Sequence, residues 1–302
     1  MALRPAITWL DRRATAGAPA TDPTDASGTL LYDLGRDAWA LDVMDLLGLR
    51  PGLLAPVLAP GARAGPLLPG PAAELGLAPG IPVATGVSDT AASLLAARLP
   101  GPEWALLTLG TGGQWIMPCG SDAVADPTGR TSLFRAADGG LFRLGGAQNV
   151  GVTLNWVRGI LGVSWDDLYG SAATASPSRP PVFTPELVTE RSASASAPTP
   201  ASAPTPALAG GGWSGVTLAH TRDDLMRAAL VGVADLLRQR LDDLRATGCL
   251  PGKVMLGGGG SRHRAWRDLL AAELGLPLYP ASTSWLTARG ATMLAARMAG
   301  ND

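Results

Sequence analysis

The first group of residues that could do chemistry in this sequence is a run of glycines toward its C-terminal end. Gly257–Gly260 follow the short apolar run Val254–Leu256 and precede Ser261 and a helical pattern. This order predicts a strand, a tight turn and a helix start. A ligand can lie directly on glycine backbone because no Cβ blocks its approach, and the unpaired N–H groups of a helix start attract anions. The segment therefore favours a nucleotide or another phosphate-bearing ligand. A glycine-rich turn required only for packing is the alternative.

A second candidate is the carboxylate of Asp89. It stands where a strand candidate, residues 81–87, gives way to a helical pattern at residues 90–99. Open α/β sheets bind ligands beyond the carboxyl ends of their strands, and a carboxylate at that place can accept the proton of a hydroxyl nucleophile. The same position suits a helix N-cap, which Ser88 or Asp89 could provide. The sequence leaves both roles of Asp89 open.

The third candidate is the glycine-rich turn Gly110–Gly113. It joins the strand candidates 104–109 and 114–117, so it is expected to be the turn of a hairpin. Successive backbone N–H groups in such a turn form a nest that binds anions, and the hydroxyl of Thr111 adds a further donor. An ordinary hairpin turn is the alternative.

Two common phosphate-binding motifs are excluded. Gly252-Lys253 is not part of a P-loop, because Val254 stands where serine or threonine is needed and the upstream glycine is missing. Gly257–Gly260 also makes a poor dinucleotide fingerprint, since no acidic residue ends a second strand at the required distance. A nucleotide would therefore be held by two separate glycine turns.

Composition narrows the class of protein. The chain has 302 residues, of which 46% are hydrophobic and 16% charged, so a sizeable core can form; its net charge of −1 offers no attraction for nucleic acid or an anionic membrane. No apolar run is long enough to span a membrane, and the N-terminus lacks a signal-peptide pattern. Two cysteines, Cys119 and Cys249, and two histidines predict neither a disulfide framework nor a metal cluster, and both cysteines are expected to be small buried residues. The sequence thus predicts a soluble cytoplasmic protein without a metal site.

The elements that must position these candidates alternate along the chain. Further strands are expected at 132–135, 141–144 and 278–279, and helices at 39–49, 151–160, 165–173, 222–246, 263–274 and 286–298. Two hairpins interrupt the alternation, so we expect an α/β fold with a sheet of mixed strand directions. Residues 190–212 contain Ala-Ser-Ala-Pro-Thr-Pro twice and are predicted to be a flexible insertion rich in Ala, Ser, Pro and Thr.

Seven segments resemble, in the same order, the FGGY family of carbohydrate kinases, and its xylulokinase branch in particular. The similar segments are Arg4–Arg13, Thr21–Pro23 and Asp25–Asp33 with Trp39, Gly86–Ala92, Leu109–Gly113, Gly151–Trp156, Arg227–Ala234 and Gly257–Trp266. Each segment is a weak signal alone, but their common order makes the resemblance strong. The resemblance is thin only in the insertion.

The resemblance implies a fold, a reaction and a set of site residues. It implies an actin-like ATPase (ribonuclease H-like) C-terminal domain over residues 81–302, after a truncated remnant of the family's N-terminal domain over residues 1–80. It also implies transfer of the γ-phosphate of ATP, with Mg²⁺, to a hydroxyl of a pentulose such as D-xylulose. Asp89 would be the catalytic base and, together with Thr90, would bind the sugar. The residues that would bind ATP are Gly110, Thr111, Gly112, Gly113, Gly151, Gly257, Gly258, Gly259, Gly260 and Ser261.

Departures from the family pattern keep other functions open. The sequence has no counterpart of the family's Asp-x-Gly-Thr phosphate loop or of its Met-His-Gly stretch, and the family's Gly-Asp-Asn/Gln is Ser88-Asp89-Thr90 here. One alternative is an ATP-binding domain without catalysis, either a decayed kinase or a subunit that needs a second chain. Another is an unrelated actin-fold ATPase or a sugar-binding regulator. Because truncation would expose apolar surface, we expect a homodimer or a partner that supplies the missing domain.

Overall fold

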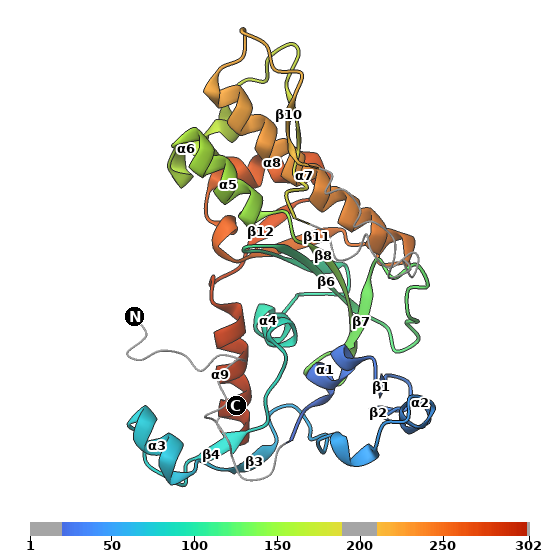
Figure 1. Cartoon of the computed structure of the whole chain (residues 1–302). Coiled ribbons are helices and arrows are strands. Elements are labelled where there is room, and N and C mark those ends of the chain that lie inside the picture. The colour runs from blue at the N-terminus through green and yellow to red at the C-terminus, as the bar shows by residue number, and fades with distance from the viewer. Residues whose placement is uncertain (1–19, 189–209, 301–302) are drawn as a thin grey trace. The chain divides into compact units, whose positions relative to one another are not determined.

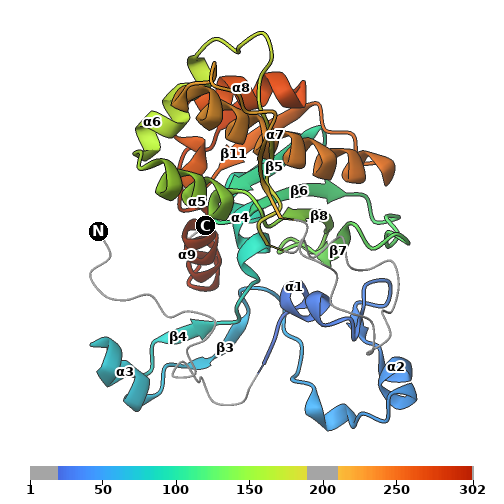
Figure 2. The ribbon, with the colours of Figure 1, turned by 45° about the horizontal axis from the view of Figure 1, so that its top comes forward.

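The computed structural model describes residues 20–188 and 210–300, which divide into two compact units (Figures 1 and 2). The first unit combines Met1–Ala96, Phe134–Gly140 and Thr287–Asp302, and the second combines Ala97–Leu133 and Leu141–Leu286. The predicted insertion at 190–212 lies outside the described residues apart from its last three, and Arg4–Arg13 lies outside them entirely. Across the described ranges, no helix has the length and apolar character needed to cross a membrane.

The second unit is built on a six-stranded sheet with the strand order β12-β11-β5-β6-β8-β7. Its strands are β5 (Trp104–Leu109), β6 (Gly113–Cys119), β7 (Ser132–Arg135), β8 (Leu141–Ala147), β11 (Lys253–Gly257) and β12 (Leu278–Pro280). β11 is parallel to both of its neighbours, β5 and β12, whereas β6 is antiparallel to β5 and β8. The expected mixture of strand directions is confirmed, and the turn after Leu109 is where the chain reverses between β5 and β6.

Four helices cover one face of this sheet in both views (Figures 1 and 2). They are α5 (Gly151–Leu161), α6 (Trp165–Gly170), α7 (Arg222–Ala246) and α8 (Arg264–Leu274). α7 has the bounds that the sequence predicted, and a capping box at Thr221 defines its start. Its apolar stripe lies in the core, where Leu230, Val233 and Leu237 are fully buried. The indole N–H of Trp115 donates a hydrogen bond to the Leu237 carbonyl at 2.9 Å, which ties β6 to the middle of α7.

Smaller elements complete the second unit. They are the 3₁₀ turns Ser171–Ala173 and Gly259–Ser261 and the antiparallel pair β9 (Val182–Thr184) and β10 (Gly212–Ser214). β9 packs directly on α7, because a Cβ on Gly232 would lie 2.2 Å from the carbonyl oxygen of Phe183.

The first unit is made of short elements. Its helices are α1 (Pro23–Ala26), α2 (Leu41–Leu46), α3 (Pro69–Leu75), α4 (Asp89–Ala97) and α9 (Leu286–Met298), with 3₁₀ turns at Ser27–Thr29 and Pro51–Leu53. Its strands form two small antiparallel sheets, β1 (Tyr32–Asp33) with β2 (Ala38–Trp39) and β3 (Arg63–Pro66) with β4 (Pro82–Ala84). The helix expected at 39–49 is shorter than predicted, because Trp39 pairs with Tyr32 in a hairpin and Gly48 adopts a left-handed φ of 66°.

Candidate nucleotide site and catalytic carboxylate

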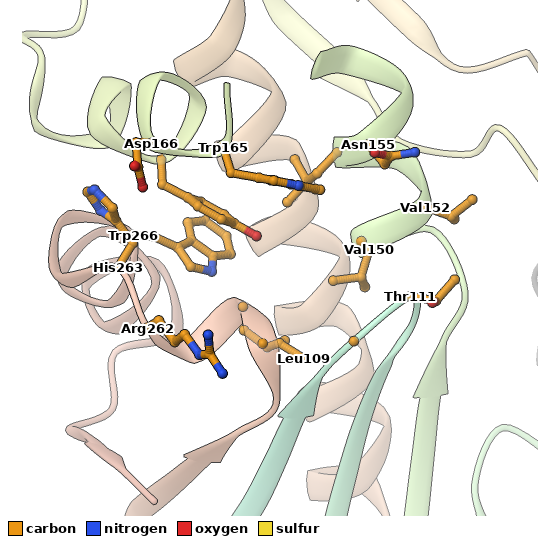
Figure 3. Close-up of a pocket in the computed structure, with 16 residues that line it drawn as sticks. Leu109, Thr111, Val150, Val152, Asn155, Trp165, Asp166, Arg262, His263 and Trp266 are labelled. Atoms are coloured by element: carbon orange, nitrogen blue, oxygen red, sulfur yellow. The ribbon is translucent and has the colours of Figure 1, made fainter. Parts of the chain in front are cut away.

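The two predicted glycine turns lie side by side in the second unit, because the strands that lead into them are neighbours. β5 ends at Leu109 and the parallel β11 ends at Gly257, which pairs with Thr108. Parallel neighbouring strands deliver their following loops to the same edge of a sheet. Together with α5, α6 and α8, these loops line a cavity of about 680 Å³ (Figure 3).

Close backbone packing accounts for glycine at two of the predicted positions. Gly258 adopts a φ of +83°, and a Cβ there would lie 2.3 Å from the Leu109 carbonyl oxygen. A Cβ on Gly151, at the start of α5, would lie 2.0 Å from the Gly110 carbonyl oxygen. A side chain at either position would force these segments apart. Packing by itself therefore requires glycine at both positions, in addition to any contact with a ligand.

Other backbone groups of the turns are open to a ligand. Gly110, Thr111 and Gly259 are exposed, and a Cβ on Gly259 would meet nothing within 4 Å. Gly260 lines the cavity beside them. α5 begins next to Thr111, whose carbonyl accepts a hydrogen bond from the Val152 N–H at 2.8 Å. The positive end of the α5 dipole therefore lies at this cavity, where it favours an anion.

The predicted phosphate turn separates two hollows of similar size. Gly112 and Gly113 line a second cavity, also of about 680 Å³, which shares Thr111 and Val152 with the first. Thr111 is thus accessible from both cavities, and its hydroxyl is the side-chain donor that the turn offers to a ligand in either of them.

Ser261 supports the second glycine turn from behind. Its hydroxyl donates to the Gly258 carbonyl at 2.7 Å, and the Arg267 guanidinium donates to the Ser261 carbonyl at 2.9 Å. Ser261 is buried and, like Gly257 and Gly258, is not among the described residues that line the first cavity. Its direct contact with ATP stays a prediction, whereas its hydrogen bond holds the shape of the turn.

An aromatic wall, formed by Trp165, Tyr169, His263 and Trp266, lines one side of the cavity (Figure 3). The ring centroids of Trp165 and Tyr169 lie 5.4 Å apart, and Tyr169 also stacks on His263 and Trp266. Burial raises the pKa of Tyr169. Such flat rings suit the face of a heterocyclic base. The sequence analysis did not identify this wall, although Trp165 and Tyr169 are four residues apart on a predicted helix and therefore share one face.

The wall continues into a charged part of the cavity. Asp166 lines it from α6, and Arg262 lines it from the end of the 3₁₀ turn Gly259–Ser261, just before α8; both are labelled in Figure 3. The Arg262 guanidinium donates to the Ser284 hydroxyl at 3.1 Å. A guanidinium beside two glycine turns adds positive charge where an anionic ligand would bind.

Asn149 anchors the start of α5. Its side chain is fully buried. The amide oxygen accepts hydrogen bonds from the N–H groups of Leu187 and Val188 at 2.9 and 2.8 Å, and the amide nitrogen donates to the Val188 carbonyl at 2.7 Å. This residue was not predicted, because its partners lie nearly 40 residues away in the sequence.

Asp89 belongs to the first unit, where it is the first residue of α4 and is exposed. Its carboxylate accepts hydrogen bonds from the N–H and the hydroxyl of Thr90 at 2.6 and 3.1 Å. The helix is capped by Ser88, whose hydroxyl accepts from the Ala91 N–H at 3.3 Å. Ser88 therefore provides the cap that the sequence left open between Ser88 and Asp89, and the chemical role of Asp89 stays a prediction.

A chain of hydrogen bonds from the N-terminal segment fixes the loop before Asp89. The Ser88 N–H donates to the Thr24 hydroxyl at 2.8 Å, and this hydroxyl donates to the Asp22 carboxylate. Asp22 is 3% exposed and caps α1, and burial raises the pKa of its carboxyl. The signal in the sequence was Asp22-Pro23, an N-cap followed by proline at the first helical position. The positioning role of Asp22 required the tertiary structure.

The chain belongs to the FGGY family of carbohydrate kinases. The model of the family's C-terminal domain matches residues 105–299, and the model of its N-terminal domain matches residues 7–96. The resemblance seen in the sequence is confirmed, and part of the N-terminal domain is present. The α/β fold with its mixed six-stranded sheet is the actin-like ATPase fold of these kinases.

The alignments with named relatives and with solved structures extend over most of this chain. Xylulose kinase of Escherichia coli is 30% identical over 263 residues, which are 86% of this chain and 52% of that protein. Glycerol kinase of Bordetella parapertussis is 29% identical over 310 residues, which cover 97% of this chain and 57% of that protein. The crystal structure of xylulose kinase from Rhodospirillum rubrum matches with a TM-score of 0.75 and 28% sequence identity, and the match covers 95% of this chain and 57% of that chain. The chain thus spans about half the length of the curated relatives it matches.

Proposed function

We propose that this chain acts as an ATP-dependent carbohydrate kinase that transfers the γ-phosphate to a hydroxyl of a pentulose such as D-xylulose. The observation that carries the proposal is the cavity where two glycine turns, a helix start and an aromatic wall meet. Membership in the FGGY family supports the reaction class. The similarity to xylulose kinases supports the pentulose, while the similarity to glycerol kinase keeps a smaller polyol among the candidate substrates.

In this proposal ATP occupies the cavity of the second unit. The adenine base stacks on the aromatic wall, and the backbone of Gly259 and Gly260 lies against the adenosine. The Gly110 N–H already donates to the Gly112 carbonyl at 2.8 Å. The β- and γ-phosphates are therefore held by the other N–H groups of the Gly110–Gly113 turn and by the Thr111 hydroxyl, assisted by the positive end of α5. Phosphoryl transfer depends mainly on such positioning and charge stabilisation.

Asp89 is the proposed catalytic base. Its carboxylate takes the proton of the sugar hydroxyl as the hydroxyl oxygen attacks the γ-phosphorus and ADP leaves. Thr90, which is hydrogen-bonded to Asp89, contributes to holding the sugar.

Mg²⁺ is expected to accompany ATP. The described ranges contain no group of three or more His, Cys, Asp and Glu side chains that could hold a metal ion. A Mg²⁺ ion bound to phosphates keeps several water ligands and needs only one or two carboxylates from the protein, so this donor set is compatible with it. When bound, Mg²⁺ would neutralise phosphate charge, and the protein's own task would remain to orient the phosphates.

The test is ADP release by the purified chain with MgATP. D-xylulose, L-xylulose, D-ribulose, glycerol and no acceptor are compared for the native chain, for Asp89→Asn and for a matched control, Asp268→Asn. Asp268 is an exposed carboxylate on α8 whose side chain is 69% accessible. We expect release only with an acceptor, a loss of roughly 10²–10⁴-fold in Asp89→Asn because a positioned base contributes that much, and no change in the control. Native turnover in Asp89→Asn would refute the role of Asp89.

The second candidate function is ATP binding without independent catalysis. It is favoured by exposed leucines of the first unit, such as Leu46 at 85%. In that case calorimetry would detect ATP binding while no acceptor stimulates ADP release. Three further statements stay predictions: a homodimer, a partner that supplies the remaining domain, and a cytoplasmic location. Sedimentation across a concentration series tests the homodimer.

A further inference from the structure

The two cysteines of the chain lie beside each other in the second unit. Cys119 ends β6, and Cys249 lies in the loop between α7 and β11. Their Sγ atoms are 3.7 Å apart, both thiols are free, and both residues are partly buried. Because 130 positions separate them in the sequence, only the tertiary fold brings them together. The expectation of two separate buried residues does not account for this pairing.

The surroundings favour a thiolate on Cys249. The hydrogen bond from Cys119 outweighs the cost of desolvation and, with the Thr247 hydroxyl and the Arg143 guanidinium, lowers the pKa of Cys249 to about 6. The same hydrogen bond, together with burial, raises the pKa of Cys119. A thiol beside a cation is the kind of thiol that becomes nucleophilic near neutral pH.

The cation is held firmly in position. Arg143 is only 2% exposed. Its guanidinium donates hydrogen bonds to the Thr131 hydroxyl at 3.1 Å and to the Val124 carbonyl at 2.6 Å. Because these bonds restrict Arg143, its positive charge stays near the two sulfur atoms rather than turning toward solvent.

We propose that Cys119 and Cys249 form a redox-active dithiol that a hydroperoxide oxidises to a disulfide. The Cys249 thiolate attacks the peroxide oxygen, the O–O bond breaks, and the leaving oxygen takes a proton to become water or an alcohol. The resulting sulfenic acid is then attacked by the Cys119 sulfur, which forms the S–S bond and releases water. The peroxide thereby accepts the two electrons that the two thiols lose. Disulfide formation requires the sulfur atoms to approach from 3.7 Å to about 2.05 Å.

The dithiol lies at the opposite end of the sheet from the glycine turns. β6 runs away from the Gly110–Gly113 turn and ends at Cys119, while Cys249 precedes β11, whose far end carries Gly257. β11 has five residues and β6 has seven, and strands of these lengths span roughly 16–23 Å. The disulfide would therefore join β6 to the chain entering β11 and stabilise the unit without reaching the nucleotide cavity, so this inference is independent of the proposed function.

The experiment treats the purified full chain with hydrogen peroxide, removes the excess, and measures intact mass, non-reduced peptide maps and thermal unfolding. We expect a mass loss of two hydrogen atoms, a peptide that joins Cys119 to Cys249, and a Tm several degrees higher that reverts with dithiothreitol. Failure of the folded chain to form this internal disulfide would overturn the proposal. ATP affinity, measured in parallel, reports on the proposed function separately.

Single variants identify the attacking sulfur. In Cys119→Ser, Cys249 should be oxidised to a sulfenic acid that a dimedone reagent traps. Cys249→Ser should react more slowly, because burial still raises the pKa of the remaining Cys119 thiol. Neither variant, nor the double Cys→Ser variant, should gain stability with peroxide, and circular dichroism checks that each is folded. Equal oxidation rates in the two single variants, or a peroxide-induced rise in Tm in the double variant, would contradict the mechanism.

Discussion

The two units of the chain differ in how completely they cover their apolar side chains. In the second unit, α7 alone buries ten residues, and Trp115 and Leu237 are fully enclosed. In the first unit, Leu30, Leu46 and Leu53 are 90%, 85% and 61% exposed. Burial of apolar surface is the main favourable contribution to folding. The second unit therefore contains the larger apolar core, although it also exposes Leu218, Val124 and Trp285, whereas the short elements of the first unit leave several leucines uncovered.

The same contrast divides the candidate site. The glycine turns, the start of α5 and the aromatic wall belong to the well-covered second unit, so the nucleotide cavity has rigid support. Asp89 and Thr90 belong to the first unit, where short elements are held by hydrogen bonds such as that from Ser88 to Thr24. Under the proposed function, nucleotide binding would depend on the second unit's core, whereas catalysis would also depend on the stability of the first unit.

The largest expected effect is the loss of stability when a buried leucine of the second unit is truncated, and an exposed leucine of the first unit is its control. Leu237→Ala removes a fully buried side chain from the middle of α7 and is expected to lower the free energy of unfolding by about 2–5 kcal/mol. Leu46→Ala removes a side chain that is 85% exposed and should change it by less than about 0.5 kcal/mol. Denaturant unfolding followed by fluorescence and circular dichroism measures both. Equal losses would mean that the first unit has a hidden core of its own.

Close helix packing offers a test within the first unit. A Cβ on Gly290 of α9 would lie 2.0 Å from the Ala92 carbonyl oxygen of α4, so Gly290→Ala should overpack the helix pair and cost about 1–3 kcal/mol. Gly70→Ala in α3 is the matched control, because a Cβ there meets nothing within 4 Å. Native-state hydrogen exchange of peptides from α4 and α9 detects the local loss. Unchanged protection in Gly290→Ala would show that the two helices are not packed this tightly.

Nucleotide affinity should respond to one glycine of α5 and not to another. Gly151→Ala places a methyl group against the Gly110 carbonyl and should displace the phosphate turn, weakening ATP binding by about tenfold or more, or about 1.4 kcal/mol. Gly159→Ala lies on the same helix, has no atom within 4 Å of the added Cβ, and should stabilise the helix by about 0.5–1 kcal/mol. Isothermal titration calorimetry measures the ATP affinity of both variants. Equal affinities of Gly151→Ala and Gly159→Ala would argue against the predicted phosphate turn.

The smallest effect concerns acid stability of the second unit. The carboxylate of Asp126 accepts hydrogen bonds from the N–H and hydroxyl groups of Thr128 and Thr131. Burial raises the pKa of Asp126, but these four bonds outweigh it and lower the pKa from 3.8 to about 2. Because the folded-state value is the lower one, the stabilisation is complete above pH 3.8 and is lost as the pH falls toward about 2.

The magnitude of this stabilisation should be modest. Asp126 is partly exposed, so solvent screening reduces it to roughly 1 kcal/mol or less. Unfolding measured between pH 5 and pH 2 should show a shallower loss in Asp126→Asn than in the native chain. If the stability of the two proteins falls equally with pH, Asp126 does not contribute to the acid-dependent loss of stability.

Local patterns in the sequence were sufficient for the elements that carry the nucleotide cavity. The apolar stripe of α7 predicted both of its ends, and the glycine runs after 104–109 and 254–256 predicted two turns at strand ends. Each of these features depends on residues within one helix or one hairpin, where periodicity and glycine's conformational freedom act directly. The family resemblance rested on the same local segments.

The contacts between distant segments were decided by the tertiary structure alone. The pairing of Cys119 with Cys249, the hydrogen bonds of Asn149 to residues 187 and 188, and the chain from Asp22 to Ser88 join positions that no local pattern connects. The aromatic wall likewise needs α6 and α8 to converge on one cavity. Such contacts form only when a whole core packs at once, because each side chain's neighbours depend on the volume and direction of every other buried side chain. The sequence by itself therefore determined the elements and the family, and the packing of those elements determined which side chains line the cavity.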